Sequence, residues 1–301
     1  MVATQPPLPI NIMPLQYADI PIVSRNTASA FAVDPHTLVK QLGKGGYDMY
    51  AISSSGFLDN LGKKNYMHFK AVSVDPTTND DTGETTILGH ISWAFRGVSD
   101  QELDKMPRPH QPPITAEEAT NTIVTVAAED ENTTTTAAAA VADDEEATNK
   151  IQRLHDLEDE DMQAWMSSIV PPGPCIFVTG LIVAPGYQSR GVGSRLLQKL
   201  NETADAMGLC VWVHSSHQAY RAYHKAGFEV TRVLELDLDE WATRGPREDE
   251  AVMGDLNLDG TRQGGELGGN GLEEGEQGQR KWGRYIIRYL KREPRFPASS
   301  V

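Results

Sequence analysis

A short turn, Gln188–Ser194, combines two glycines with an arginine between an apolar segment and a helical pattern. Gly191 and Gly193 lack Cβ atoms, so their backbone N–H groups can approach a ligand closely. Together with the start of the expected helix, these N–H groups favour an anion, and Arg190 adds positive charge. A pyrophosphate would fit here. The spacing matches neither a P-loop nor a dinucleotide fingerprint, and the alternative is a turn whose glycines serve packing only.

Other side chains that could do chemistry follow this turn or precede it closely. Tyr223 could donate a proton, or its ring could simply pack in the core. His214 could accept a proton, although a histidine at a strand end is more often a hydrogen-bonded structural residue. His214 and His217 have no cluster of cysteines or carboxylates beside them, so we expect no metal site. Cys175 and Cys210 lie in apolar segments and are expected to be core residues, not nucleophiles.

These residues belong to segments in which strand and helix patterns alternate. Apolar runs and helical spacing predict, in order, the strand Cys175–Ala184, the helix Gly193–Met207, the strand Leu209–His214, the helix Gln218–Ala226 and the strands Phe228–Leu238 and Trp282–Leu290. The preceding part predicts a strand Ile10–Leu15, a helix capped by Asp19, a helix His36–Leu42, a long hairpin of His68–Val74 and Thr85–Phe95, and an amphipathic helix Leu154–Met166.

Two segments carry the negative charge of the chain. The 301 residues include 42 acidic and 27 basic side chains, a formal net charge of −15. Residues 115–149 and 245–279 hold 18 of the acidic and two of the basic residues, so the other 231 residues are nearly neutral. Runs of threonine and alanine cannot bury a varied apolar face. We therefore predict a flexible tail over 1–9 and one domain over 10–301, interrupted by disordered acidic inserts at about 100–149 and 245–279.

Composition argues against several classes of protein. Two cysteines are too few for a disulfide framework, and no apolar run is long enough to span a bilayer. The first residues lack the pattern of a secretory signal. The acidic balance argues against wrapping of nucleic acid or of an anionic membrane. We expect a cytoplasmic protein, with the nucleus as an alternative, that has no nucleic-acid or membrane partner.

Two motifs resemble those of the GNAT family of N-acetyltransferases. The segment Leu181–Leu197, LIVAPGYQSRGVGSRLL, is similar to the family's acyl-CoA-binding motif, L-x-V-x-P-x-x-Q-x-x-G-x-G followed by a small residue and two leucines. The segment Ala219–Phe228 is similar to the family's A-x-x-x-Y-x-x-x-G-F helix and turn, with Tyr223 in register. The resemblance is strong over 175–238, diffuse over 10–97 and absent from both acidic inserts.

The resemblance implies an α/β fold of the α+β type. Its mixed central sheet would have six to seven strands, splayed between the fourth and the fifth, with helices on its faces. In this family the pantetheine arm of acetyl-CoA lies between two parallel strands, here Ile176–Ala184 and Leu209–His214, and bonds to one of them like an added strand. The cofactor-binding residues implied by the resemblance are Leu181, Ile182, Val183, Gln188, Ser189, Arg190, Gly191, Val192, Gly193, Ser194 and Ser216.

The resemblance also implies direct attack of an amine on the thioester, which needs a backbone donor for the oxyanion and an acid for the departing thiolate. Tyr223 stands at the family's acid position. Some members carry a glutamate as the base eleven positions before the motif's glutamine, where this chain has Phe177. His214 is then the candidate base, directly or through water. Ser216 stands where many relatives have an asparagine that contacts the cofactor, and a hydroxyl would make that contact more weakly.

We therefore expect an acetyl-CoA-dependent N-acetyltransferase that acts on a primary amine, that of a small molecule before that of a basic peptide. The alternative is a catalytically weak acyl-CoA-binding or interaction module whose acidic inserts recruit basic partners. Phe177 at the base position favours this module, whereas the intact turn and Tyr223 favour the enzyme. The sequence leaves a monomer and a homodimer equally open.

Overall fold

The structure, a computed structural model, describes residues 9–43, 47–74, 85–106, 145–168, 170, 172–253 and 280–295. These residues form a mixed seven-stranded sheet in the order β1-β2-β3-β4-β5-β7-β6. Its strands are β1 (Asn11–Pro14), β2 (Tyr66–Val74), β3 (Thr85–Arg96), β4 (Cys175–Val183), β5 (Cys210–Ser215), β6 (Glu229–Asp237) and β7 (Arg284–Arg292). Strands β4 and β5 are parallel, and all other neighbouring strands are antiparallel. The predicted mixed sheet flanked by helices is confirmed.

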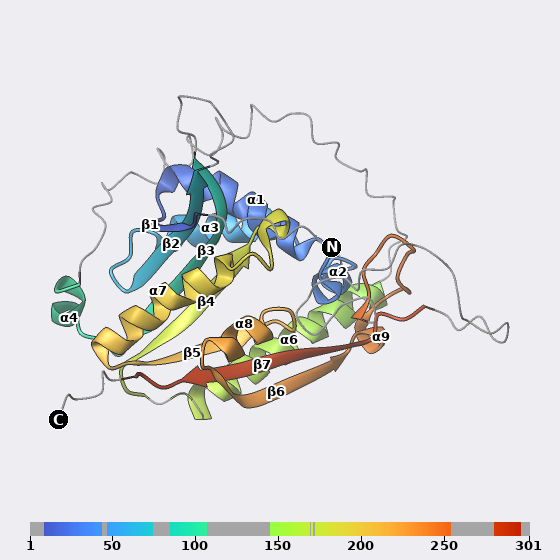
Figure 1. The fold of residues 1–301 in the computed structure, drawn as a ribbon. Coiled ribbons are helices and arrows are strands. Elements are labelled where there is room, and N and C mark those ends of the chain that lie inside the picture. Colours follow the sequence, from blue (N-terminus) through green and yellow to red (C-terminus); the bar gives the residue numbers. More distant parts are fainter. Residues whose placement is uncertain are drawn as a thin grey trace.

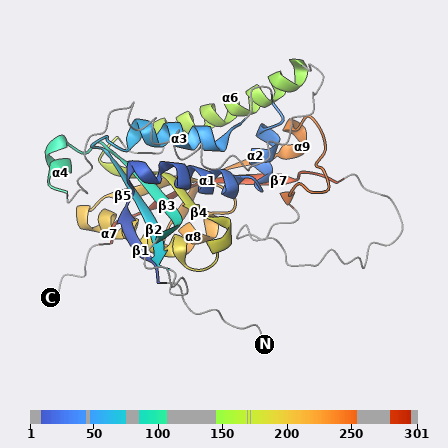
Figure 2. The same cartoon turned by 90° about the horizontal axis from the view of Figure 1, so that it is seen from above.

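Helices cover both faces of this sheet. They are η1 (Tyr17–Asp19), α1 (Ile20–Phe31), α2 (Pro35–Lys40), α3 (Met49–Asn60), α4 (Asp100–Asp104), α6 (Glu145–Ser168), η2 (Pro185–Tyr187), α7 (Val192–Met207), α8 (Tyr220–Lys225) and α9 (Leu238–Trp241). In Figures 1 and 2, α7 and α8 lie on one face, while α1, α3 and α6 lie on the other. The layers therefore place α1 and α3 across β3 and β4 from α7.

The core divides according to these two faces. Alternate residues of a strand point to opposite faces. On β5, Val211 and Val213 join a cluster with Leu196 of α7, whereas Trp212 joins a second cluster with Trp165 of α6. The middle of the sheet is thus buried on both faces. The site lies there, at β4 and β5.

Helix α3 was not predicted from the sequence. Its apolar side chains are spread around the helix, and only Ser54 and Phe57 are buried. The N-terminus is fixed by Asp48, whose carboxylate accepts hydrogen bonds from the backbone N–H groups of Tyr50 and Ala51 at 2.9 and 3.1 Å. A cap of this kind explains a helix that lacks one apolar face.

Some residues of the two expected inserts are described by the structure. Residues 100–104 form α4, which begins with a reciprocal capping box between Ser99 and Glu102, and 145–149 form the first turns of α6. Residues 245–253 are also described. In this segment the Glu250 carboxylate accepts hydrogen bonds from the Arg244 guanidinium at 2.6 and 2.7 Å. Residues 107–144 and 254–279 of the expected inserts, and residues 1–8 of the expected tail, lie outside the described residues.

Within the part of the chain that the structure describes, no helix is long and apolar enough to cross a membrane.

Candidate active site

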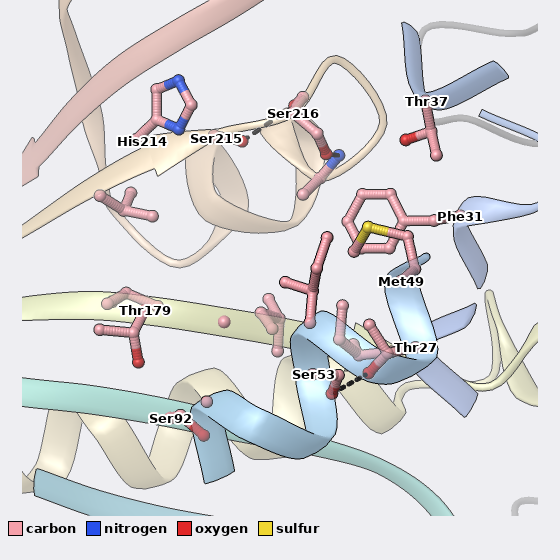
Figure 3. A pocket seen from close by; sticks show the side chains of 18 of the residues that line it. Thr27, Phe31, Thr37, Met49, Ser53, Ser92, Thr179, His214, Ser215 and Ser216 are labelled. Atoms are coloured by element: carbon pink, nitrogen blue, oxygen red, sulfur yellow. Dashed lines mark hydrogen bonds between the residues drawn. The ribbon is translucent and has the colours of Figure 1, made fainter. Parts of the chain in front are cut away.

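The sheet opens between its two parallel strands. Pairing of β4 with β5 runs from Cys175 opposite Cys210 to Val178 opposite Val213, and the described residues of the two strands do not pair further along. At this point β3 pairs Trp93 with Val178 and Ser92 with Gly180, which leaves Thr179 as a β-bulge. Figure 3 shows Thr179 on β4, with β5 on one side and α3 on the other. The bulge therefore marks the point where the gap begins, as the splay predicted between the fourth and fifth strands requires.

The backbone direction of β4 decides which of its groups face the gap. The N–H of Ala184 donates to the carbonyl of Leu88 on β3 at 2.9 Å. In an antiparallel pair, alternate residues turn both backbone groups to the same neighbour, so Ile182 also bonds toward β3. Leu181 and Val183 consequently turn theirs to the gap. The backbone of Ile182 therefore faces β3, whereas a contact between Ile182 and a ligand in the gap stays a prediction.

The turn after β4 forms an open cradle of backbone groups. Ser189 and Gly191 adopt left-handed conformations with φ of 58° and 85°, and α7 begins directly afterwards. Such a turn at a helix start directs N–H groups outward and favours an anion. The Gln188 side chain donates to the carbonyl of Val183 at 3.3 Å, which ties the turn to β4.

The other turn residues divide into exposed and buried positions. Ser194 is exposed at the start of α7, and the guanidinium of Arg190 lies 5.6 Å from the ring centre of Tyr187. Gly193 has room around its Cα, since a Cβ there would meet only the Val183 side chain at 3.6 Å. The Val192 side chain is 1% exposed and belongs to the core. Of Val192, only the backbone can therefore contribute to the cradle.

One cavity of about 540 Å³ joins the gap to the helices above it. Strands β2 and β3 line it with Tyr66, His68, His90 and Ser92. Most of the other lining residues belong to three groups. The gap contributes Val178, Thr179, Gly180, Leu181, Ile182, Val213, His214, Ser215, Ser216 and Tyr223; α1, α2 and α3 contribute Thr27, Phe31, His36, Thr37, Lys40, Met49, Ile52 and Ser53; and Glu158, Tyr285 and Ile287 close the end near α6 and β7. Figure 3 labels members of the first two groups around the same space: Thr179, His214, Ser215 and Ser216 of the gap, and Thr27, Phe31, Thr37, Met49 and Ser53 of the helices. The cavity thus connects the open edge of β4 with polar and apolar side chains that could hold a second molecule.

Tyr223 lies on α8 at the edge of the gap. Its side chain is 2% exposed and lines the cavity, and its ring packs edge-on against Phe228 at 5.2 Å. Burial raises the pKa of the Tyr223 hydroxyl well above its usual value. The phenol therefore stays protonated near neutral pH, the state from which it can donate a hydrogen bond or a proton.

His214 also lines the cavity, but its surroundings disfavour the charged form. In Figure 3 its ring extends from β5 away from Thr179, and it packs against Tyr289 with 5.1 Å between ring centres. Burial is the main cause that lowers the pKa of His214 to about 4, and the nearby Glu158 opposes this only in part. His214 is therefore neutral at pH 7 but a weak base.

Ser216 and His217 follow the end of β5, in the turn before α8. The Ser216 hydroxyl accepts a hydrogen bond from the backbone N–H of Ala219 at 3.4 Å, next to α8. Burial lowers the pKa of His217, which does not line the cavity. Ser216 thus reaches the cavity while its oxygen is engaged by the turn before α8.

The structure brings together three titratable side chains, His36, Lys40 and Glu158, which were not predicted from the sequence to lie in the site. The Nε2 atom of His36 lies 2.5 Å from Oε1 of Glu158, whose other oxygen accepts a hydrogen bond from Lys40. All three side chains line the cavity. Because 122 positions separate His36 from Glu158, no local spacing could have revealed the pair. The one sequence signal was the pattern of the helix that begins beside His36.

The two cysteines do not line this cavity. Both are free thiols, and burial raises the pKa of Cys175. The Cys210 sulfur accepts a hydrogen bond from the indole N–H of Trp212 at 3.3 Å. Among the described residues, no group of three or more His, Cys, Asp or Glu side chains could hold a metal ion.

The chain is similar in part to known acetyltransferases. Residues 101–228 match the model of the acetyltransferase (GNAT) family. A mycothiol acetyltransferase of Amycolatopsis mediterranei is 41% identical over 66 residues, which is 21% of this chain and 22% of that protein. The chain therefore matches under a quarter of the length of this curated relative.

Solved acetyltransferase structures are similar at low identity. Arylalkylamine N-acetyltransferase 2 from Aedes aegypti aligns with a TM-score of 0.47 and 12% identity, over 95% of this chain and all of that chain. Arabidopsis thaliana NAA60 in complex with acetyl-CoA aligns with a TM-score of 0.41 and 11% identity, over 94% of this chain and 98% of that chain.

Proposed function

Because residues 101–228 match the model of the acetyltransferase (GNAT) family, we propose that this protein transfers an acetyl group from acetyl-CoA to a primary amine of a small molecule. The observation that carries the proposal is the open edge of β4, where Leu181 and Val183 turn backbone groups into a gap beside an anion-favouring turn. An extended amide-bearing arm that ends in a pyrophosphate has the chemistry that fits both features.

Acetyl-CoA would supply an acyl group activated as a thioester. The backbone of Leu181 and Val183 would hold its pantetheine arm, and the N–H groups of the turn Gln188–Ser194 would hold its pyrophosphate. The free N–H of Leu181 also offers a donor to negative charge that develops on the carbonyl oxygen. These contacts orient the acyl carbon toward the cavity, where an amine can approach.

Tyr223 would assist the departure of the thiolate. Its hydroxyl is protonated at neutral pH because burial raises its pKa. The same low-polarity surroundings would raise the basicity of a thiolate there, which makes transfer of the phenolic proton to sulfur less unfavourable than in water. The phenolate would then regain a proton from the nitrogen of the new amide.

The size and lining of the cavity support a small acceptor. A volume of about 540 Å³ lies within the range of small-molecule sites. Phe31, Met49 and Ile52 supply an apolar wall, and hydroxyl groups such as those of Thr27 and Ser53, joined by a 3.3 Å hydrogen bond, lie beside it. An amine with an apolar body and few polar groups would fit this lining better than a long charged peptide.

The test is a thiol-release assay on the purified full-length protein with acetyl-CoA. The amine panel would contain small primary amines with apolar bodies, polyamines and a lysine-rich peptide, and the blank would contain no amine. We expect release only with amine, and strongest with the small apolar amines. Calorimetric binding of acetyl-CoA without release by any amine would favour a binding module instead, and release by the peptide alone would contradict the small-molecule acceptor.

A further inference from the structure

Three titratable side chains form a hydrogen-bonded network between α2 and α6. His36 and Lys40 lie one turn apart on α2 and bond the two carboxylate oxygens of Glu158, His36 through Nε2 at 2.5 Å. The side chains of His36, Lys40 and Glu158 are only 12%, 7% and 13% exposed. His36 is further held by the ring of Tyr285, which stacks on it with 4.7 Å between ring centres and 22° between ring planes. The imidazole is thus oriented from two sides.

The state of Glu158 determines which imidazole nitrogen carries the proton. Burial alone would raise the pKa of Glu158, but the hydrogen bonds and charges of His36 and Lys40 outweigh it and lower that pKa to about 2. An ionised carboxylate can only accept hydrogen bonds, so Nε2 of His36 must be the donor. Neutral His36 then carries its lone pair on Nδ1, which makes no hydrogen bond to another described residue.

A histidine oriented by a carboxylate in this way is the usual arrangement of a general base. When Nδ1 takes up a proton, the carboxylate stabilises the resulting imidazolium. His214, the base expected from the sequence, lacks such a partner, since its ring packs on Tyr289 and burial lowers its pKa to about 4. Among the described residues, four histidines line the cavity: His36, His68, His90 and His214. Burial lowers the pKa of the last three, and of the four only His36 is hydrogen-bonded to a carboxylate within the described ranges.

We propose that His36 is the general base of this site and that Glu158 is its positioning residue. The proposal rests on the proposed acetyltransferase function. A substrate ammonium group would pass one proton to Nδ1 of His36, directly or through water, and the free amine would attack the acyl carbon. The second nitrogen-bound proton would leave by way of Tyr223 as the carbon–sulfur bond breaks, and His36 would release its proton to solvent. One amide, one thiol and one proton result.

Several titratable or charged groups lie near His36. Glu158 and His155 belong to α6, Lys40 to α2, His214 to β5 and Tyr285 to β7. The negative charge of Glu158 favours an imidazolium at His36, and the positive charge of Lys40 opposes it. Replacement of Glu158 therefore removes the favourable charge. His155 lies outside the cavity lining and provides a matched control.

The first experiment compares His36→Gln, Glu158→Gln and His155→Gln in the thiol-release assay from pH 5.5 to 9.5. Glutamine at position 36 keeps a hydrogen-bond donor but cannot take up a proton. We expect kcat of H36Q to fall by about 10²-fold at pH 7, and the loss to shrink toward pH 9.5 as the amine deprotonates in solution. Affinity for acetyl-CoA and the activity of H155Q should stay near wild type. A loss that is equal at every pH would indicate a structural role and would overturn the proposal.

The second experiment needs no turnover and therefore separates this proposal from the proposed function. Imidazole ¹⁵N spectra of the labelled protein, with H36Q to identify the signals, report the tautomer and titration of His36. We expect the Nε2–H tautomer in the wild-type protein and a mixture of tautomers in E158Q, because an amide can both donate to the imidazole and accept from it. The Nδ1–H tautomer in the wild-type protein, or an unchanged tautomer in E158Q, would overturn the proposal even if amines are acetylated. A wild-type protein that shows the expected tautomer but acetylates no amine would contradict the proposed function alone.

Discussion

Val178 of β4 pairs with Val213 of β5, and this is the last pair before the two parallel strands separate. Both side chains are buried in the cluster beneath α7, so the strands are held together up to this point. The next residue of β4 is the bulged Thr179, and the next residue of β5 is His214. The gap therefore begins at a defined position, directly before Thr179 and His214, and all four of these residues line the cavity.

Replacement of Tyr223 by phenylalanine should lower turnover and spare cofactor binding. The ring packing on Phe228 is retained, whereas the proton donor to the leaving sulfur is lost. We expect kcat to fall by about 10²-fold, with the Kd for acetyl-CoA unchanged in calorimetry. Tyr220 lies on the same helix and does not line the cavity. The guanidinium carbon of Arg288 lies 4.4 Å from the centre of the Tyr220 ring. Y220F should keep the wild-type kcat, and equal losses in both variants would exclude the acid role.

Gly191→Ala should weaken acetyl-CoA binding. Gly191 has a φ of 85°, a conformation that costs an alanine about 1–2 kcal/mol. The turn would relax and its N–H groups would no longer converge, so we expect Kd to rise by about tenfold. Gly186 lies in the same connection, and a Cβ there would meet no atom within 4 Å. G186A serves as the control, and a G191A protein with wild-type affinity would show that the turn does not bind the pyrophosphate.

Gly89→Ala should destabilise the fold next to the open edge of β4. A Cβ at Gly89 would lie 2.4 Å from the backbone oxygen of Ile182, and backbone in the middle of a sheet cannot easily move. We expect the free energy of unfolding in urea to drop by about 1–3 kcal/mol. Gly56 in α3 has no atom within 4 Å of such a Cβ, so G56A should be neutral or stabilising. Equal stability of G89A and wild type would contradict the close approach of β3 and β4.

Asp205→Asn should destabilise the protein more at neutral pH than in acid. The Asp205 carboxylate on α7 bonds Arg292 of β7 through two contacts of 2.8 Å. The hydrogen bonds from Arg292 lower the pKa of Asp205 in the folded protein. Its contribution is therefore complete above the unfolded-state pKa and disappears as pH falls through the lower folded-state pKa. Urea unfolding should show a loss of about 1–2 kcal/mol at pH 7 and a smaller loss at pH 3.

A control for this ion pair is the exposed contact of Lys64 with Asp104. These side chains are 57% and 59% exposed and 3.0 Å apart. Surface pairs of this kind contribute little, so D104N should change stability hardly at all. A D205N protein that behaves like D104N would show that the contact between α7 and β7 does not stabilise the fold.

Local patterns in the sequence predicted much of the fold and part of the site. The turn Gln188–Ser194 and the helix after it follow from glycine positions and helical spacing, and the short helix that carries Tyr223 follows from its own pattern. Their consequences are local, because backbone conformation and amphipathic spacing act within a few residues. Helix α3 escaped prediction because its start depends on the Asp48 cap and its apolar side chains share no face.

The sequence by itself therefore determined the anion-favouring turn, the strand and helix order from 175 to 238, and the residue types of the acid. Only the tertiary structure decided that Leu181 and Val183 turn their backbone to the gap while Ile182 does not, because that depends on the register of β4 with β3. It also decided which histidine meets a carboxylate. His36 and Glu158 are brought together by the packing of α2 against α6, a contact between distant segments that no local spacing encodes.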